Sequence, residues 1–431
     1  MSMRNNLRLL TFTTILILMA SCSGNSSSNS VTFMVFGDPA ERDAYLSLVA
    51  EFEEKHPDID VEVTHIPSPR DYRTRLATEY AAGSPPDVSL MNYRRYGSFA
   101  ASGLLEPLGE RLDSSNLIQP EDFYPITLDS FHWQGELMCI PQNISSLVVY
   151  YNMDLFDDAE LTYPSDHWTW DEFLETAVAL TKDLNGNGRV DQYGLGTDTS
   201  FFRLIPFVWQ NEAPIVDNTE FPKRLTLTRP PSLAAFEWFV ELQTVHGVIP
   251  DRIAEASQDS ESRFIAGTVG MFLNSRRGTP SYREIESFEW DVAPLPQGES
   301  AAGILHSDAY CLSSVSGNKE AAWTFIEFAN SPEGQTIIAS SGRTVPSLRA
   351  VAESDIFLNP GLPPARSQVW LNTISTLRIV PVMSTWQEVE SVAGEEFERA
   401  LYGDISAEEA AMLSFIRTEE YFRLAVFGAE E

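Results

Sequence analysis

The chain has 431 residues, of which 43% are hydrophobic and 11% aromatic, a composition typical of a folded globular protein and not of a disordered one. Its 62 acidic residues outnumber 29 basic ones, which gives a formal net charge of -33 at pH 7. A surface of this charge repels phosphate backbones, so nucleic acid is excluded as an expected partner. The length exceeds what one hydrophobic core usually supports, and we therefore expect two domains.

The first 21 residues have the pattern of a secretory signal. Two arginines precede an apolar run at 9–19, which is too short to span a bilayer because a spanning helix needs about 20 residues. The run ends in Ala20-Ser21-Cys22, which resembles a bacterial lipobox. We expect Cys22 to be acylated and residues 22–30, rich in Ser, Gly and Asn, to tether the protein to a membrane of the cell envelope. The alternative is an ordinary signal cleaved near Ala20, with Cys22 left as a spare thiol.

Strand and helix patterns alternate from residue 31 onward. Apolar runs predict strands at 31–36 and 88–91, a period of two predicts a strand at 59–63, and amphipathic segments predict helices at 40–55 and 70–82. This alternation is typical of a parallel α/β sheet. Later patterns predict strands at 137–141 and 147–151, and helices at 170–181, 232–245, 321–329 and 406–427. A second set of elements of this size indicates a second α/β lobe.

One segment matches the first part of a calcium-binding loop. Asp183, Asn185, Asn187 and Asp191 place oxygen side chains at positions 1, 3, 5 and 9, with glycine at position 6. The ligand set is incomplete, because position 12 is Gly194, where a bidentate glutamate is expected. The alternative is a turn rich in Asn and Asp between a helix and a strand. Calcium, if bound, would be structural and remote from any ligand site.

Several short segments, in a fixed order, resemble the family 1 extracellular solute-binding proteins. They include 57–61, 81–88, 170–173, 264–271 and 342–347, and together they extend over most of residues 31–350. The resemblance implies an α/β fold of two lobes of the class II periplasmic-binding type, with a ligand cleft between lobes that crossing strands join. It also implies a non-enzymatic binding component of an ABC importer, which closes around a small sugar and delivers it to the permease subunits. No cofactor is required for that function, and a monomer is expected.

The resemblance also implies how the chain divides between the lobes. Lobe 1 would contain residues 31–140 and 309–345, lobe 2 would contain residues 141–308 and 346–431, and crossings would lie near 137–146, 304–313 and 343–347. Cys139 and Cys311 would then both lie on crossing strands. Two buried thiols are expected there rather than a disulfide, because the geometry of adjacent strands rarely suits one.

Sugar recognition needs flat aromatic faces for the C–H patches of the ring and polar side chains for its hydroxyls. Loops that follow strands at the cleft are where both are expected. The candidates in these loops are Asp38, Asn92, Tyr93, Arg94, Asn143, Trp209, Asn274, Arg276, Ser307, Asp308, Arg343 and Trp386. A buried strand end is an equal alternative for Trp209. Each arginine could equally pair with a carboxylate, but two that converged in the cleft would favour an anionic sugar acid.

Two other functions compete with this interpretation. A hydrolase acting on glycans would need two facing carboxylates about 5 to 9 Å apart, and acidic residues are too abundant here for their presence to decide. The sequence holds no Gly-x-Ser-x-Gly elbow, His-Glu-x-x-His pair or Walker loop. The second alternative is a binding protein that serves a sensor kinase rather than a permease.

Overall fold

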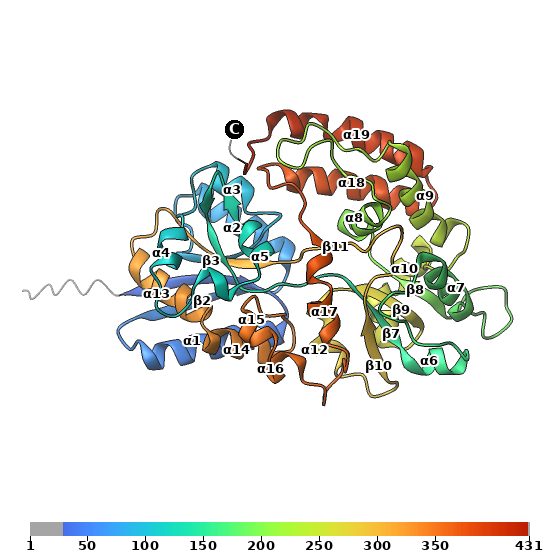
Figure 1. Ribbon diagram of the computed structural model, residues 1–431, viewed down its shortest axis with the longest axis horizontal. Helices are drawn as coiled ribbons and strands as arrows, with labels where there is room; N and C mark the ends of the chain where they lie inside the picture. The colour runs from blue at the N-terminus through green and yellow to red at the C-terminus, as the bar shows by residue number, and fades with distance from the viewer. Residues whose placement is uncertain (1–28, 430–431) are drawn as a thin grey trace, which may run out of the picture.

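The first lobe is built on a five-stranded mixed sheet. The computed structural model describes residues 29–429, and Figure 1 shows this lobe beside a second one. The strand order is β2 (Asp60–Ile66), β1 (Ser30–Phe36), β3 (Val88–Asn92), β12 (Asp308–Leu312) and β6 (Cys139–Pro141). Strand β1 is parallel to β2 and β3, whereas β12 is antiparallel to β3 and β6. The prediction of an α/β fold is confirmed.

Local signals explain why the first two helices begin where they do. Asp38 caps helix α1 (Pro39–Lys55) by accepting a hydrogen bond from the Glu41 backbone N–H at 3.0 Å. Ser68 caps α2 (Pro69–Ala81) in the same way. Both helices match the predicted bounds to within one residue. The other helices of this lobe are α3 (Gly97–Ala101), α4 (Gly109–Asp113), α5 (Pro125–Asp129), α13 (Lys319–Ala329), α14 (Pro332–Ser340), α15 (Arg349–Ala352) and α16 (Asp355–Leu358), with the short strands β4 (His132–Trp133) and β5 (Glu136–Leu137) and a 3-10 turn, η1 (Pro120–Asp122).

The second lobe has a four-stranded sheet of its own. Its order is β10 (Trp290–Ala293), β7 (Val148–Asn152), β9 (Val269–Asn274) and β8 (Tyr193–Gly196), and every residue of β9 is buried. Around it lie α6 (Met153–Asp158), α7 (Trp170–Leu180), α8 (Phe201–Gln210), α9 (Pro230–Thr244), α10 (Arg252–Ser257), α11 (Ser260–Ile265), α12 (Thr279–Tyr282) and α17 (Gln368–Asn372), with the 3-10 turns η2 (Arg276–Gly278) and η3 (Ile374–Thr376). The strands β11 (Gly303–Ile304) and β13 (Leu377–Arg378) pair separately.

The chain ends in a helical hairpin of α18 (Trp386–Leu401) and α19 (Ala407–Leu424). It packs on α8 and α9 and lies along the upper edge of the molecule in Figure 1. Helix α19 is shorter than the predicted helix 406–427. No helix among residues 29–429 is long and apolar enough to cross a bilayer.

Two crossing segments run side by side between the lobes. Ser145 and His306 exchange two backbone hydrogen bonds of 2.7 Å, and Ile144 donates to the Val345 carbonyl at 2.8 Å. The third crossing lies further along than expected. Helices α15 and α16 pack on α14 of the first lobe, and the chain joins the second lobe after them, where the Pro363 carbonyl accepts from Arg283 at 2.8 Å and the Arg366 N–H donates to Asp291 at 3.0 Å. The prediction that residues 346–431 all belong to lobe 2 is therefore wrong for 349–358, whose short helices give no distinct sequence signal.

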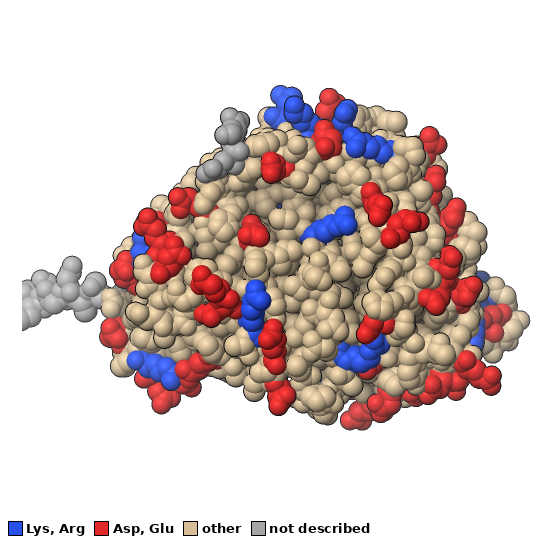
Figure 2. Space-filling model, in the orientation of Figure 1, with Lys and Arg blue, Asp and Glu red and all other residues tan. Residues whose placement is uncertain are grey.

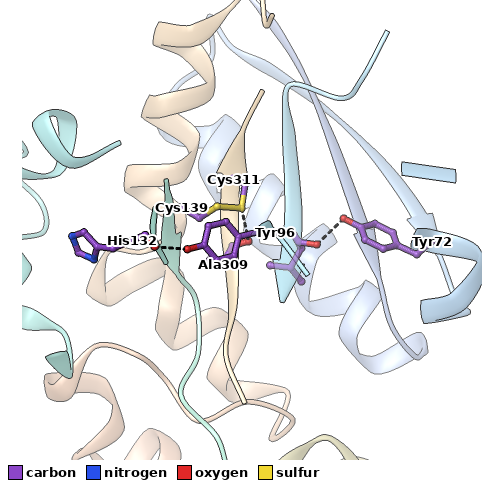
Figure 3. The surroundings of a disulfide bond; sticks show 7 residues. Tyr72, Tyr96, His132, Cys139, Ala309 and Cys311 are labelled. Carbon is purple, nitrogen blue, oxygen red and sulfur yellow. Dashed lines mark hydrogen bonds between the residues drawn. A yellow bond between two sulfur atoms is a disulfide. The ribbon is translucent and has the colours of Figure 1, made fainter. Parts of the chain in front are cut away.

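The two described cysteines form a disulfide, contrary to the expectation of free thiols. Cys139 on β6 and Cys311 on β12 are directly opposite in antiparallel register, with Cα atoms 4.5 Å apart. That separation is typical of a non-hydrogen-bonded pair, and it lies within the range that disulfides span. Figure 3 shows the bond between the two strands, with Tyr96 next to it donating to the His132 carbonyl at 2.7 Å. The sequence could not reveal this register.

Acidic side chains outnumber basic ones on the face of the molecule drawn in Figure 2. Figure 2 shows them scattered over the whole face in view, with fewer basic side chains between them. This distribution follows the net charge of -33. It makes any local excess of positive charge on the molecule informative.

Candidate functional site

A cavity of about 790 Å³ lies between the lobes and has the size of a small-molecule site. Side chains from both lobes and from the crossing segments line it, which is the arrangement that lets lobe closure bury a ligand. We call this cavity the cleft. Its aromatic side chains are Phe36, Tyr72, Phe99 and Phe202.

A polar network at the start of β12 forms the floor of the cleft between the lobes. Asp308 accepts hydrogen bonds from the side-chain amides of Asn92 at 3.0 Å and Asn143 at 3.4 Å. Burial raises the pKa of Asp308, and the two amide donors oppose that shift. The network fixes three hydrogen-bonding side chains at the point where the chain crosses between lobes.

A buried ion cluster adjoins this network at the N-terminus of α1. The Arg343 Nε lies 2.6 Å from a Glu41 carboxylate oxygen, and its Nη1 contacts Asp38. Burial raises the pKa of Glu41 to about 7, although Arg343 opposes the shift. Gly37 makes this packing possible, since its φ of +136° favours glycine and a Cβ there would lie 1.7 Å from the Glu41 carboxylate. Arg343 also donates to the Arg277 carbonyl at 3.0 Å and so joins the two lobes.

A second ion cluster joins the loop after β3 to α18. Arg94 Nη1 and Arg95 Nη2 lie 2.8 and 2.7 Å from the two oxygens of one carboxylate, that of Glu390. The Arg94 and Glu390 side chains are only 9% and 6% exposed. The Arg94 guanidinium also stands over the ring of Phe202, 4.5 Å from its centroid. These contacts connect the first lobe with helices of the second.

On the other side of the cleft, Arg203 extends from α8. It pairs with Asp198 at 2.6 Å and donates to the Asn274 side-chain oxygen at 3.3 Å. Its Nη1 is buried without a hydrogen-bond partner in the described residues. The neighbouring His306 also lines the cleft, and burial, followed by the charge of Arg94, holds its pKa well below the usual value. His306 is therefore neutral near pH 7.

The structure brings five of the predicted residues to the cleft: Asn92, Arg94, Asn143, Asp308 and Arg343. Asp38 adjoins it through Arg343. The other six do not line the cavity, and they are Tyr93, Trp209, Asn274, Arg276, Ser307 and Trp386. Asn274 and Ser307 each form a hydrogen bond with a residue that does line the cleft. Asn274 accepts from Arg203, and the Ser307 hydroxyl donates to the Asn143 carbonyl at 2.7 Å.

The remaining four are held in the protein interior. Arg276 donates to the Gly342 carbonyl at 2.8 Å and stands over the rings of Phe357 and Trp370, each 4.8 Å away. Trp209 belongs to helix α8 and lines a different hollow. The alternative prediction, that Trp209 lies at the end of a buried strand, is therefore wrong. Tyr93 and Trp386 are at most 1% exposed. Sequence spacing placed these residues near element ends but could not orient them.

Sequence reasoning missed Phe202, Arg203, Arg73 and His306, all of which line the cleft. Residues 201–210 are almost all buried apolar side chains, and such a run resembles a strand as much as a helix. The available signal was Arg203 itself, because a charged side chain within an apolar run needs a buried partner.

The loop at 183–191 lies outside the cleft, and its acidic oxygens are already engaged. The Asp183 carboxylate accepts backbone N–H groups of Gly186 and Gly188 at 2.7 Å, and that of Asp191 accepts from the Asn185 side-chain amide at 2.8 Å. No group of three or more His, Cys, Asp or Glu side chains within residues 29–429 is arranged to hold a metal ion. Calcium binding at Asp183, Asn185, Asn187 and Asp191 stays a prediction, which a lower melting temperature on adding a chelator would support.

Two α/β lobes around a polar cleft, joined by side-by-side crossing segments, define a two-lobed solute-binding protein. The model of the bacterial extracellular solute-binding protein family matches residues 38–336, so the chain belongs to that family. This membership confirms the prediction of a binding protein that is not an enzyme.

Individual relatives are distant in sequence but similar in structure. A protein of Brucella abortus named as a binding protein is 24% identical over 343 residues, which cover 76% of this chain and 78% of the relative. The maltotriose-binding protein of Pyrococcus abyssi is 23% identical over 304 residues, which cover 68% of this chain and 61% of that protein. An ABC substrate-binding protein from Listeria monocytogenes in complex with cycloalternan has a TM-score of 0.83 at 25% identity, covering 91% of this chain and 98% of that one.

Proposed function

We propose that this protein is the extracellular receptor of an ABC importer for a carbohydrate. The observation that carries the proposal is the cleft of about 790 Å³, whose lining includes both Asn92, Asn143 and Asp308 and several aromatic side chains. Amide and carboxylate groups satisfy sugar hydroxyls, and aromatic rings cover the apolar faces of a sugar. The relatives named for binding maltotriose and cycloalternan support a carbohydrate as the ligand class.

Titration calorimetry of the purified protein against a panel of mono- and oligosaccharides tests this proposal. At least one saccharide should bind with a dissociation constant in the micromolar range or below. Asn143→Ala should weaken that binding about tenfold or more, because it removes one of the hydrogen bonds made when water is expelled. A matched control is Asn187→Ala, an exposed asparagine in the loop outside the cleft. Silence across the whole panel would overturn the proposal.

We also propose that the protein is anchored to the cell envelope by acylation of Cys22 and acts there as a monomer next to its permease. Cys22 and the signal at 1–21 lie outside the described residues, so the proposal rests on the sequence pattern. Cys22→Ser should move the protein from the membrane fraction to the soluble fraction of fractionated cells. Retention of the variant on the membrane would contradict the anchor, and its ligand binding should be unchanged either way.

A further inference from the structure

The cleft lacks the acidic excess of the rest of the molecule. Seven arginines line it with four acidic residues, and three further carboxylates, those of Asp38, Glu261 and Glu390, pair with these arginines, whereas the whole chain has 29 basic and 62 acidic residues. The acidic ones are Glu41, Asp198, Asp308 and Glu388. So many arginines set the cleft apart from the acidic surface, and arginine is the side chain best suited to carboxylate and sulfate groups.

On the first lobe, the arginines exceed the carboxylates available to them. Arg94 and Arg95 share the single carboxylate of Glu390, and half-buried Arg73 of α2 forms no ion pair with any residue from 29 to 429. Burial lowers the pKa of Arg73, the nearby charge of Glu390 raises it, and the charges of Arg94 and Arg70 lower it. Three arginines therefore share the charge of Glu390, and an anion beside Arg73 would stabilise the cluster.

The second lobe places a further guanidinium opposite this cluster. The Arg94 and Arg203 guanidinium carbons, one from each lobe, both lie within 5.0 Å of the Phe202 ring centroid. Arg203 is 2% exposed, and its Nη1, although buried, has no partner in the described chain. A buried donor without an acceptor is costly, so this atom indicates a ligand oxygen.

We infer that the ligand is an anionic saccharide whose charged group lies between Arg73 and Arg94 of one lobe and Arg203 of the other. The inference rests on the proposed function and names the substrate class for the same cleft. Guanidinium groups donate from several nitrogens, so Arg94 and Arg203 can contact an anion while they keep their pairs with Glu390 and Asp198. A carboxylate, as in a uronide, and a sulfate ester share the required chemistry. Because the anion contacts both lobes, it also favours their closure.

Matched saccharide pairs test the inference by calorimetry on the purified protein. Each pair consists of a neutral sugar and its uronic acid at equal chain length, for galactose, glucose and mannose units, and sulfated sugars form a third arm. One acidic member should bind at least tenfold more tightly than its neutral partner. The tighter of the uronide and sulfate arms identifies the charged group.

Two variants on helix α2 connect the preference to the cleft. Arg73→Gln should weaken binding of the acidic sugar about tenfold more than binding of its neutral partner. The control is Arg75→Gln, because Arg75 is 57% exposed, pairs with Glu79 and does not line the cavity. Equal or tighter binding of neutral sugars, with no effect of Arg73→Gln, would overturn the inference and leave the proposed function intact. If no sugar binds, neutral or acidic, both the inference and the proposed function are overturned.

Discussion

Glu41 makes stability depend on pH in the direction opposite to an ordinary paired carboxylate. Burial raises its pKa from 4.5 to about 7, so between these values the folded state holds a proton that the unfolded state has released. The contribution of Glu41 to stability should fall as pH rises from about 4.5 through 7, by on the order of 3 kcal/mol. Asp308, whose pKa is also raised by burial, contributes in the same direction. His306, whose pKa is held well below the usual value by burial, contributes in the opposite direction. Urea unfolding at pH 5 and pH 8 therefore measures the Glu41 contribution as a difference between the wild type and a variant.

Glu41→Gln isolates the contribution of this one side chain. The variant should lose markedly less stability than the wild type between pH 5 and pH 8, because its amide does not titrate. Glu54→Gln, an exposed position of the same helix, is the matched control and should keep the wild-type slope. Equal slopes for Glu41→Gln and the wild type would show that Arg343 and not burial dominates at Glu41.

For single residues, the sequence predicted which side chains lie near the cleft better than it predicted the direction in which they point. Asn92, Asn143 and Asp308 were predicted because they follow or begin strands at the edge where the lobes meet, and all three line the cleft. Trp386 begins a helix and was expected there too, but it is fully buried. Its direction depends on how α18 is rotated against α8, and only tertiary packing sets that rotation.

At the scale of elements, the Cys139–Cys311 disulfide should stabilise the pairing of β6 with β12. It links residues 172 positions apart, so it restricts the unfolded chain strongly. Reduction, or Cys139→Ala with Cys311→Ala, should lower the free energy of unfolding by about 2 to 4 kcal/mol. Urea unfolding with and without reductant measures this, and the double variant should not respond to reductant. Alkylation of both thiols in the unreduced, denatured protein would contradict the bond.

The elements themselves were largely predictable where a single period dominates. Strands β1 and β3 and helices α1, α2 and α7 were predicted within about two residues, since apolar runs mark the strands, one apolar face marks each helix, and capping residues mark the helix starts. Helix α8 was not, because it is buried on nearly all sides and lacks a polar face. The partners of β6 and β12 were not predictable either, as register between segments so far apart leaves no local trace.

At the scale of the whole molecule, Glu390 is the residue through which α18 holds the first lobe. Its carboxylate is the shared partner of Arg94 and Arg95, whereas α18 itself packs on α8 and α9 of the second lobe. Removing one partner of a buried ion pair leaves the other charges uncompensated, at a cost of about 3 to 5 kcal/mol. Part of that cost should be relieved if the lobes separate and water reaches the arginines. Glu390→Ala should therefore shift the ligand-free protein toward a more open arrangement.

Small-angle scattering of the ligand-free protein measures that shift as a larger radius of gyration for Glu390→Ala than for the wild type. Glu420→Ala removes the same charge from the neighbouring helix α19, where Glu420 pairs with Arg423 and both side chains are 69% exposed. An exposed pair contributes little, so this control should keep the wild-type radius and lose less than about 1 kcal/mol. A lower melting temperature for Glu390→Ala with an unchanged radius would mean that the pair stabilises the fold locally and does not hold the lobes together. A radius of gyration that increases only in Glu390→Ala would show that the arginines of the cleft help to hold the lobes closed. The same ion pairs that position these arginines also join the two lobes.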